Sequence, residues 1–284
     1  MSDQQPLSGM PQRLTPATPT RLATWQQCPR RYRYTYLDRP RPPKGPPWAH
    51  NTVGAVAHLA LASWWRLPVA ERTPAAAAEA VNEAWPDAVA GPARGGFADD
   101  EHGTAWQARV SEMVARYTAP LDPDTEPRGV ERTVSIVYGG VALSGRVDRI
   151  DERDGQLVVV DYKTGRATPD LHDAKSSQAL AIYAAATWRT LRTPCTQVEL
   201  HHLPSGEVAA WEHDEASVRR QLDRADAVAS EIAAADAAFY EGSTGDETFP
   251  AQPSSLCGWC DFVEICPEGS QTASRRPSWS ALPD

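Results

Sequence analysis

The chain has 284 residues, 41% of them hydrophobic, and a formal net charge of −9. This length allows one large domain or two small ones, and we expect a single domain with helical elaborations. The acidic balance excludes a protein whose whole surface is built for polyanions, so any contact with nucleic acid must be local.

The predicted domain spans residues 18–267, between tails at 1–17 and 268–284 that we expect to be disordered. The first twenty residues are polar and lack the apolar core of a secretion signal, and no run approaches the roughly 18 apolar residues of a membrane span. The cysteine pattern fits a reducing compartment better than a disulfide framework. We therefore expect a cytoplasmic protein without a membrane partner.

A short helix is expected at the start of the domain. Thr18 is typical of an N-cap and the following proline of a first helical turn, and the helix should end near Cys28. In the next segment, residues 30–44, basic side chains interleave with tyrosines and offer phosphate contacts together with stacking surfaces. The alternative is a solvated element packed through its tyrosines. The candidate DNA contacts are Arg30, Arg31, Tyr32 and Arg33.

Helical spacing of apolar residues predicts helices over 52–66, 74–90 and 104–119. His58 lies within the first of these, and a lone histidine on an apolar helix face is usually a packed core residue. Residues 67–128 give no indication of function beyond a possible part in substrate selection.

The hydrophobic period changes to two near residue 130. Strands are predicted over 130–138 and 141–151, turning at two glycines, and the continuous apolar run at 157–160 is typical of a strand covered on both faces. A helix over 174–191, strands near 197–203 and 207–212, and a helix over 215–240 follow. The sequence therefore predicts an α/β fold with a mixed central sheet flanked by helices, whose catalytic core covers about 130–212.

Charged residues gather where two predicted strands end. Because side chains alternate along a strand, Asp161 and Lys163 share a face, while Tyr162 leaves its carbonyl near the same edge. If the preceding strand lies alongside, Asp148 adds a second carboxylate, and this oxygen-rich set suits Mg2+ or Mn2+. Lys163 would then orient or deprotonate an attacking water and offset charge on phosphorus. The alternatives are a surface ion pair between Asp161 and Lys163, and pairing of Asp148 with a neighbouring arginine.

The cysteines form a second candidate metal site. Cys28 stands near the N-terminus, and the other three form C-x2-C-x5-C near the opposite end: Cys257, Cys260 and Cys266. Four soft thiolates suit an iron–sulfur cluster. Zinc is the alternative, although four-cysteine zinc sites usually use two close pairs. Cys195 is expected to be an ordinary buried or loop thiol.

The order Asp148, Asp161, Lys163 resembles the PD-(D/E)XK superfamily, and more closely its RecB-like exonuclease branch, over a region from Cys28 to Cys266. The resemblance implies a PD-(D/E)XK restriction-endonuclease-like core with His58 as a metal ligand beside Asp148, Asp161 and the Tyr162 carbonyl. It also implies that Gln178 and Tyr183, which fit a Q-x4-Y motif, lie beside the active site. Glu131 falls where many relatives carry an acidic residue, but a strand-edge glutamate is commonplace.

The four-cysteine pattern resembles the subgroup that binds a 4Fe-4S cluster, which includes AddB-type helicase–nuclease subunits and nucleases of CRISPR adaptation. These resemblances imply a Mg2+- or Mn2+-dependent deoxyribonuclease, an exonuclease that serves DNA repair, recombination or related DNA processing. Single-stranded ends are the expected substrate, because the tyrosine- and arginine-rich segment suits base stacking and contacts along the backbone. One alternative is an accessory module fed by a helicase partner, since the chain lacks the G-x4-G-K-[ST] loop of a motor. The other is a non-catalytic, cluster-stabilised interaction protein.

Overall fold

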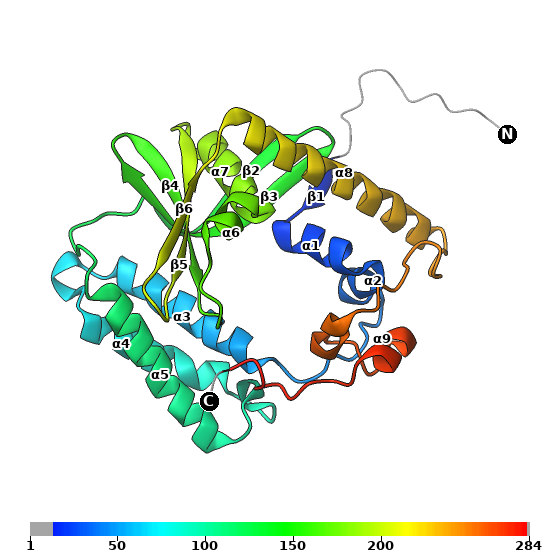
Figure 1. The fold of residues 1–284 in the computed structure, drawn as a ribbon, viewed down its shortest axis with the longest axis horizontal. Coiled ribbons are helices and arrows are strands. Elements are labelled where there is room, and N and C mark those ends of the chain that lie inside the picture. The colour runs from blue at the N-terminus through cyan, green and yellow to red at the C-terminus, as the bar shows by residue number, and fades with distance from the viewer. Residues whose placement is uncertain (1–13, 283–284) are drawn as a thin grey trace.

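The protein is described by a computed structural model over residues 14–282. The elements follow one another around a ring, with the sheet and helices α3, α4 and α5 on one side and α1, α2 and α9 on the other (Figure 1). No helix in the described range is both long and apolar enough to cross a membrane.

Six strands form one mixed sheet in the order β1-β3-β4-β5-β6, with β2 paired to β3. Their bounds are β1 Thr15–Ala17, β2 Gly129–Tyr138, β3 Val141–Arg153, β4 Gln156–Lys163, β5 Cys195–His202 and β6 Val208–Glu212. The pairs β1–β3 and β4–β5 are parallel, and the pairs β2–β3, β3–β4 and β5–β6 are antiparallel. The predicted mixed central sheet flanked by helices is therefore confirmed.

Strand β3 organises the sheet because it has three partners. β2 pairs along residues 141–150 of one edge. On the opposite edge, β1 pairs with residues 141–143 and β4 with residues 149–153. Residues 144–148 of that edge consequently face no strand within the described range, and this gap opens beside the end of β4.

Helices cover both faces of β4. On one face, Val158, Val160 and Tyr162 pack against α3 (Ala49–Arg66), α4 (Pro74–Ala88) and α5 (Asp100–Thr118). On the other face, Leu157 and Val159 pack against α7 (Gln178–Leu191). The apolar run at 157–160 is fully buried, as expected for a strand covered on both sides.

A further core joins the two ends of the chain. It is built from α1 (Pro19–Gln27), α2 (Pro29–Tyr36) and α8 (Glu215–Tyr240) against the start of β3. Thr18 caps α1 as predicted, accepting a hydrogen bond from the Arg21 backbone N–H at 3.2 Å. The buried Tyr32 hydroxyl donates to Asp236 Oδ1 on α8 at 3.0 Å, which ties α2 to α8.

Three expectations about element boundaries were wrong: the helix over 174–191 and the two terminal tails. The expected helix over 174–191 is interrupted, because Ser177 adopts an extended conformation, ends α6 (Leu171–Ser176) and caps α7 by accepting from the Leu180 N–H at 3.3 Å. The N-terminal tail expected over 1–17 includes β1, although residues 1–13 lie outside the described range. Three 3-10 turns, Val69–Glu71, Arg94–Gly96 and Ser255–Trp259, complete the elements.

The third difference concerns the C-terminal tail expected to be disordered over 268–284. Helix α9 (Pro267–Thr272) is followed by an irregular segment that ends in turns, residues 273–282, which we call the C-terminal strap. The Ser278 carbonyl accepts from the Ala49 N–H at 3.0 Å, and the Arg275 guanidinium lies over the Trp48 ring. These contacts order the strap, while residues 283–284 lie outside the described range.

The packing against β3 predicts a clear difference between two positions of the same hairpin. Ile150 is fully buried, whereas Val137 is 59% exposed. We expect Ile150→Ala to lower the free energy of unfolding by about 2–5 kcal/mol because it leaves a cavity. The control Val137→Ala should cost about 1 kcal/mol or less. Urea unfolding measures both, and equal losses would contradict this account of the core.

Candidate active site

The candidate site lies where β3 and β4 separate. Their backbone pairing ends at Arg149 and Val160. Beyond that point the Asp148 side chain takes the place of a strand partner, since its Oδ2 accepts a hydrogen bond from the Tyr162 N–H at 2.9 Å. The carboxylate is thereby fixed at the edge of the gap in the sheet.

Helix α3 delivers an imidazole to this carboxylate. His58 Nδ1 lies 3.2 Å from Asp148 Oδ1, and His58 Nε2 lies 3.1 Å from the Tyr162 carbonyl oxygen. If Nε2 carries the proton and donates to the carbonyl, the Nδ1 lone pair is directed toward Asp148. The expected residues His58, Asp148 and Tyr162 therefore do lie together, with the carbonyl placed to orient the imidazole.

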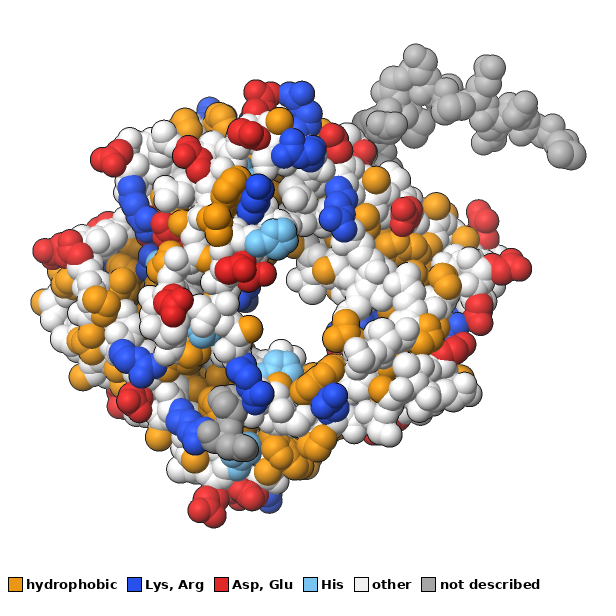
Figure 2. Space-filling view, in the orientation of Figure 1, with side chains coloured by type: hydrophobic (Ala, Val, Ile, Leu, Met, Phe, Trp, Pro, Cys, Tyr) orange, Lys and Arg blue, Asp and Glu red, His pale blue; other side chains and the backbone are white. Residues whose placement is uncertain are grey.

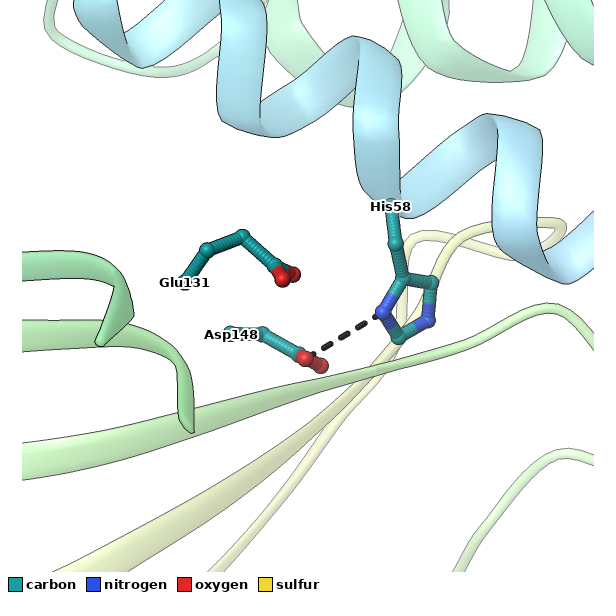
Figure 3. Close-up of side chains that lie close together, drawn as sticks. All are labelled: His58, Glu131 and Asp148. Carbon is teal, nitrogen blue, oxygen red and sulfur yellow. Dashed lines mark ion pairs between the residues drawn. The ribbon is translucent and has the colours of Figure 1, made fainter. Parts of the chain in front are cut away.

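Glu131 completes this group, although its strand-edge position is commonplace in sequence. Its ligand oxygen lies within 4.8 Å of ligand atoms of both His58 and Asp148. Figure 3 shows the two carboxylates beside each other, both directed toward the imidazole. Register places Glu131 opposite Asp148, because Val130 pairs with Arg149 and Arg132 with Val147. Like charges directly opposite are destabilising in a sheet, whereas a divalent cation between them would be favourable.

The backbone at Glu131 supports a functional role. Its φ of +50° is unusual for a residue other than glycine. Such strain persists where the surrounding structure imposes it, often at functional sites. Counting outward from the turn at Gly139 and Gly140 pairs position 131 with position 148, so the sequence already contained the signal that would have identified Glu131.

Asp161 and Lys163 lie on the last residues of β4. Lys163 Nζ is 2.6 Å from Asp161 Oδ2, which is the ion pair considered as the alternative from sequence. Burial raises the pKa of Asp161; Lys163 opposes this shift, and the nearby Asp148 carboxylate adds to it. Asp161 therefore lies near enough to Asp148 for their charges to interact, although its own close contact is with Lys163.

The other acid–base groups respond to the same concentration of charge. Burial lowers the pKa of His58, but the hydrogen bond and charge of Asp148, with smaller effects of Asp161 and Glu131, raise it overall. Burial also raises the pKa of Glu131, opposed by Arg146, whose Nε lies 2.6 Å from Glu131 Oε2. The imidazole and the carboxyl that face Asp148 therefore both have a raised pKa.

The two expected motif residues on α7 make different contacts. Tyr183 packs against Gly145, where a β-carbon would clash with its ring. Burial together with the charges of Asp161 and Asp148 raises the pKa of Tyr183 to about 12, so its hydroxyl remains a proton donor at neutral pH. Gln178 instead donates to the Gln221 carbonyl of α8 at 3.5 Å.

The four expected DNA contacts on α2 differ in their surroundings. Arg30 and Tyr32 are buried, and Arg30 donates to the Phe249 carbonyl at 3.2 Å besides pairing with acidic side chains. Arg33 pairs with Asp38 at 3.2 Å. These three are occupied in holding α2 in place, while Arg31 is half-buried and lines a surface cavity.

All four predicted cysteine ligands line one cavity of about 40 Å³. Cys28 caps the start of α2, and its sulfur accepts from the Arg31 N–H at 3.5 Å. Cys266 caps α9 in the same way, accepting from the Gly269 N–H at 3.4 Å. The fold thus gathers thiols that are more than 200 positions apart, and Cys195 is buried away from them in β5.

A comparison with protein families agrees with this geometry. A family model for the PD-(D/E)XK nuclease superfamily matches residues 16–267, and the chain belongs to this superfamily. Membership indicates a metal-dependent nuclease with DNA as the implied substrate. A similar solved structure is "Crystal structure of SSO0001", 16% identical, with a TM-score of 0.37, covering 92% of this chain and 88% of that chain. A search of curated proteins found no match.

The carboxylate pair generates a prediction about metal binding. We expect Mn2+ to raise the melting temperature of the wild type, because a ligand that binds only the folded state stabilises it. Glu131→Gln should lose most of this shift, since it removes one charge from the His58–Glu131–Asp148 group. The matched control is Glu152→Gln, a β3 carboxylate paired to Arg128 at 3.3 Å. An equal Mn2+ shift in wild type and Glu131→Gln, measured by differential scanning fluorimetry, would exclude Glu131 from the metal site.

Proposed function

We propose that the protein is a Mg2+- or Mn2+-dependent deoxyribonuclease of the RecB-like exonuclease branch, acting on single-stranded DNA ends in repair or recombination. The observation that carries the proposal is the convergence of His58, Glu131 and Asp148 within 4.8 Å, beside Lys163. A mixed set of carboxylate oxygens and one imidazole nitrogen suits Mn2+ and Mg2+.

Each residue has a role that its position permits. His58, Glu131 and Asp148 would hold the ion, with Asp161 close enough to join them on a shift of its side chain. A bound ion would polarise the scissile phosphate and lower the pKa of an attacking water. Lys163, whose side chain is 48% exposed and held by Asp161, can reach solvent and substrate, orient that water and offset charge developing on the phosphate.

The shape of the molecule supports a preference for single-stranded ends. Figure 2 shows an opening that passes through the molecule. Helix α3, which carries His58, borders the opening on one side, and α1 and α2 lie across from it (Figure 1). A strand that enters an enclosed passage must do so by its end, which favours exonucleolytic digestion of a flexible single strand. A helicase partner could supply such strands.

We further propose that the four cysteines bind a 4Fe-4S cluster. Cys28, Cys257, Cys260 and Cys266 line one cavity. Four soft thiolates suit an iron–sulfur cluster, whereas four-cysteine zinc sites usually use two close pairs. Backbone N–H groups directed at the sulfurs favour thiolates.

The nuclease proposal predicts the outcome of a cleavage assay. With 5′-labelled single-stranded DNA and Mn2+, Lys163→Ala and Asp148→Ala should each reduce the rate by at least about 100-fold, because each removes a group that acts on the reacting phosphate or its ion. Lys175→Ala, an exposed lysine on α6, is the control and should cleave like the wild type. Circular single-stranded DNA should resist digestion.

The result that contradicts the proposal is equal degradation by the wild type and both site variants. Rapid cleavage of the circular substrate would support nuclease activity but contradict the proposal that the enzyme is an exonuclease. Tight binding of DNA without cleavage by the wild type would favour an accessory module that needs a partner.

The cluster proposal predicts a second pair of outcomes. Anaerobically purified Cys28→Ala should lose the brown absorbance of an iron–sulfur cluster and become sensitive to protease, because α2 would no longer be joined to the C-terminal region. Cys195→Ala, which changes a buried thiol outside the site, is the matched control and should stay coloured. A coloured, protease-resistant Cys28→Ala would show that Cys28 is not a ligand. Zinc without iron in the wild type would show that the four cysteines bind zinc instead of a cluster.

A further inference from the structure

A second surface cavity lies between the cysteine region and the start of α3. It has a volume of about 390 Å³, and its lining includes Arg31 of α2, His50 and Asn51 of α3, Trp259 of the cysteine loop, and Trp48. The C-terminal strap also contributes Ala281, so four separate segments of the chain meet at this cavity. None of these residues has a part in the nuclease centre described above.

The walls of this cavity are aromatic. The rings of Trp48 and Trp259 are 5.2 Å apart, and the His50 ring lies 5.9 Å from that of Trp259. Trp48 is buried and forms the floor, whereas His50 and Trp259 are half-buried. His50 Nδ1 is buried and has no hydrogen-bond partner within the described range. The cavity is therefore lined mainly by aromatic rings.

The charge around the cavity is positive overall. Arg275 lies over Trp48 with its guanidinium carbon 4.7 Å from the ring centre, and Arg276 lies over Trp259 at 5.3 Å. The one carboxylate of the lining, Asp261, accepts from Trp48 Nε1 at 2.9 Å and pairs with Lys44 at 3.6 Å. Because these partners occupy Asp261, its charge does not oppose an anionic ligand.

A neighbouring cavity extends from this region toward the end of β4. It has a volume of about 340 Å³, shares His50 and Ala281 with the first, and is also lined by Thr164 and Gly165, which follow Lys163 in the sequence. Its charged lining residues are Arg109, Arg116, Arg166 and one acid, Glu112. His50 precedes His58 by eight residues on α3, which corresponds to about 12 Å along the helix axis. The two connected cavities thus run from the aromatic rings toward the end of β4, with three basic residues against one acid in the second.

We propose that the Trp48–His50–Trp259 cavity is a nucleobase subsite for single-stranded DNA, a few nucleotides away from the scissile phosphate. Aromatic faces bind bases of any sequence, and arginines follow the phosphate backbone. A connected path suits a polymer better than a small molecule. This inference rests on the proposed nuclease function and adds a fixed position for the substrate strand, with Arg31 as its phosphate contact.

The test measures binding of fluorescent oligothymidylate to the full-length protein in EDTA, which prevents cleavage whichever residue is catalytic. We expect His50→Ala and Trp259→Leu to weaken binding about 5- to 50-fold, the effect of losing one stacked base. Trp259→Phe keeps an aromatic face and should retain most of the affinity. His172→Ala, an exposed histidine on α6, is the matched control and should bind like the wild type.

A second arm identifies the base as the group that is bound. An oligomer of the same length without bases should bind the wild type more weakly, and His50→Ala should not weaken it further. Retention of the Mn2+-induced rise in melting temperature checks that each variant is folded. If the wild type binds no single-stranded DNA, the proposed function fails with the inference. If it binds and cleaves DNA while His50→Ala and Trp259→Leu bind like His172→Ala, the subsite alone is overturned.

Discussion

The hydrogen bond from the Tyr162 N–H to the Asp148 carboxylate is the contact on which the site depends. It forms where the backbone pairing of β3 and β4 stops at Arg149 and Val160. A side chain therefore satisfies a backbone donor that the sheet no longer can. The same separation exposes the end of β4, so that Asp161 and Lys163 reach the gap, and it leaves room for His58 from α3. The separation of β3 from β4 therefore creates the geometry of the active site.

The charges gathered at this gap work against the stability of the chain by itself. Carboxylates at Glu131, Asp148 and Asp161 lie in one neighbourhood, and burial or mutual repulsion raises the pKa of Glu131 and Asp161. The strained backbone at Glu131 adds to this cost. A packed α/β core on both faces of β4 supplies the stability that such a site requires. A divalent cation would relieve the repulsion, which links metal binding to folding.

The cysteine region and the C-terminal strap act on the shape of the molecule rather than on its chemistry. The four thiols lie where the start of α2 meets α9, and the strap then crosses to α3, where Ser278 accepts from the Ala49 N–H. The ring of elements is closed by this route (Figure 1). The same segments form the walls of the aromatic cavity through Trp48 and Trp259. An inorganic cluster here would therefore support the substrate path at a distance from the reacting phosphate.

The sequence by itself determined the elements and most of the chemistry, because periodicity, caps and turn residues act locally: the helix ending at Tyr240, the hairpin at Gly139 and the strand preceding Asp161 lie close to their predicted positions. Tertiary structure decided what depends on contacts between distant segments. It ordered the C-terminal strap against Trp48, and it buried Arg30 among partners that local sequence does not reveal. It also brought His58 on α3 to Asp148 and Glu131, since the approach of a helix sets ligand geometry, whereas residue type alone sets only the chemistry available.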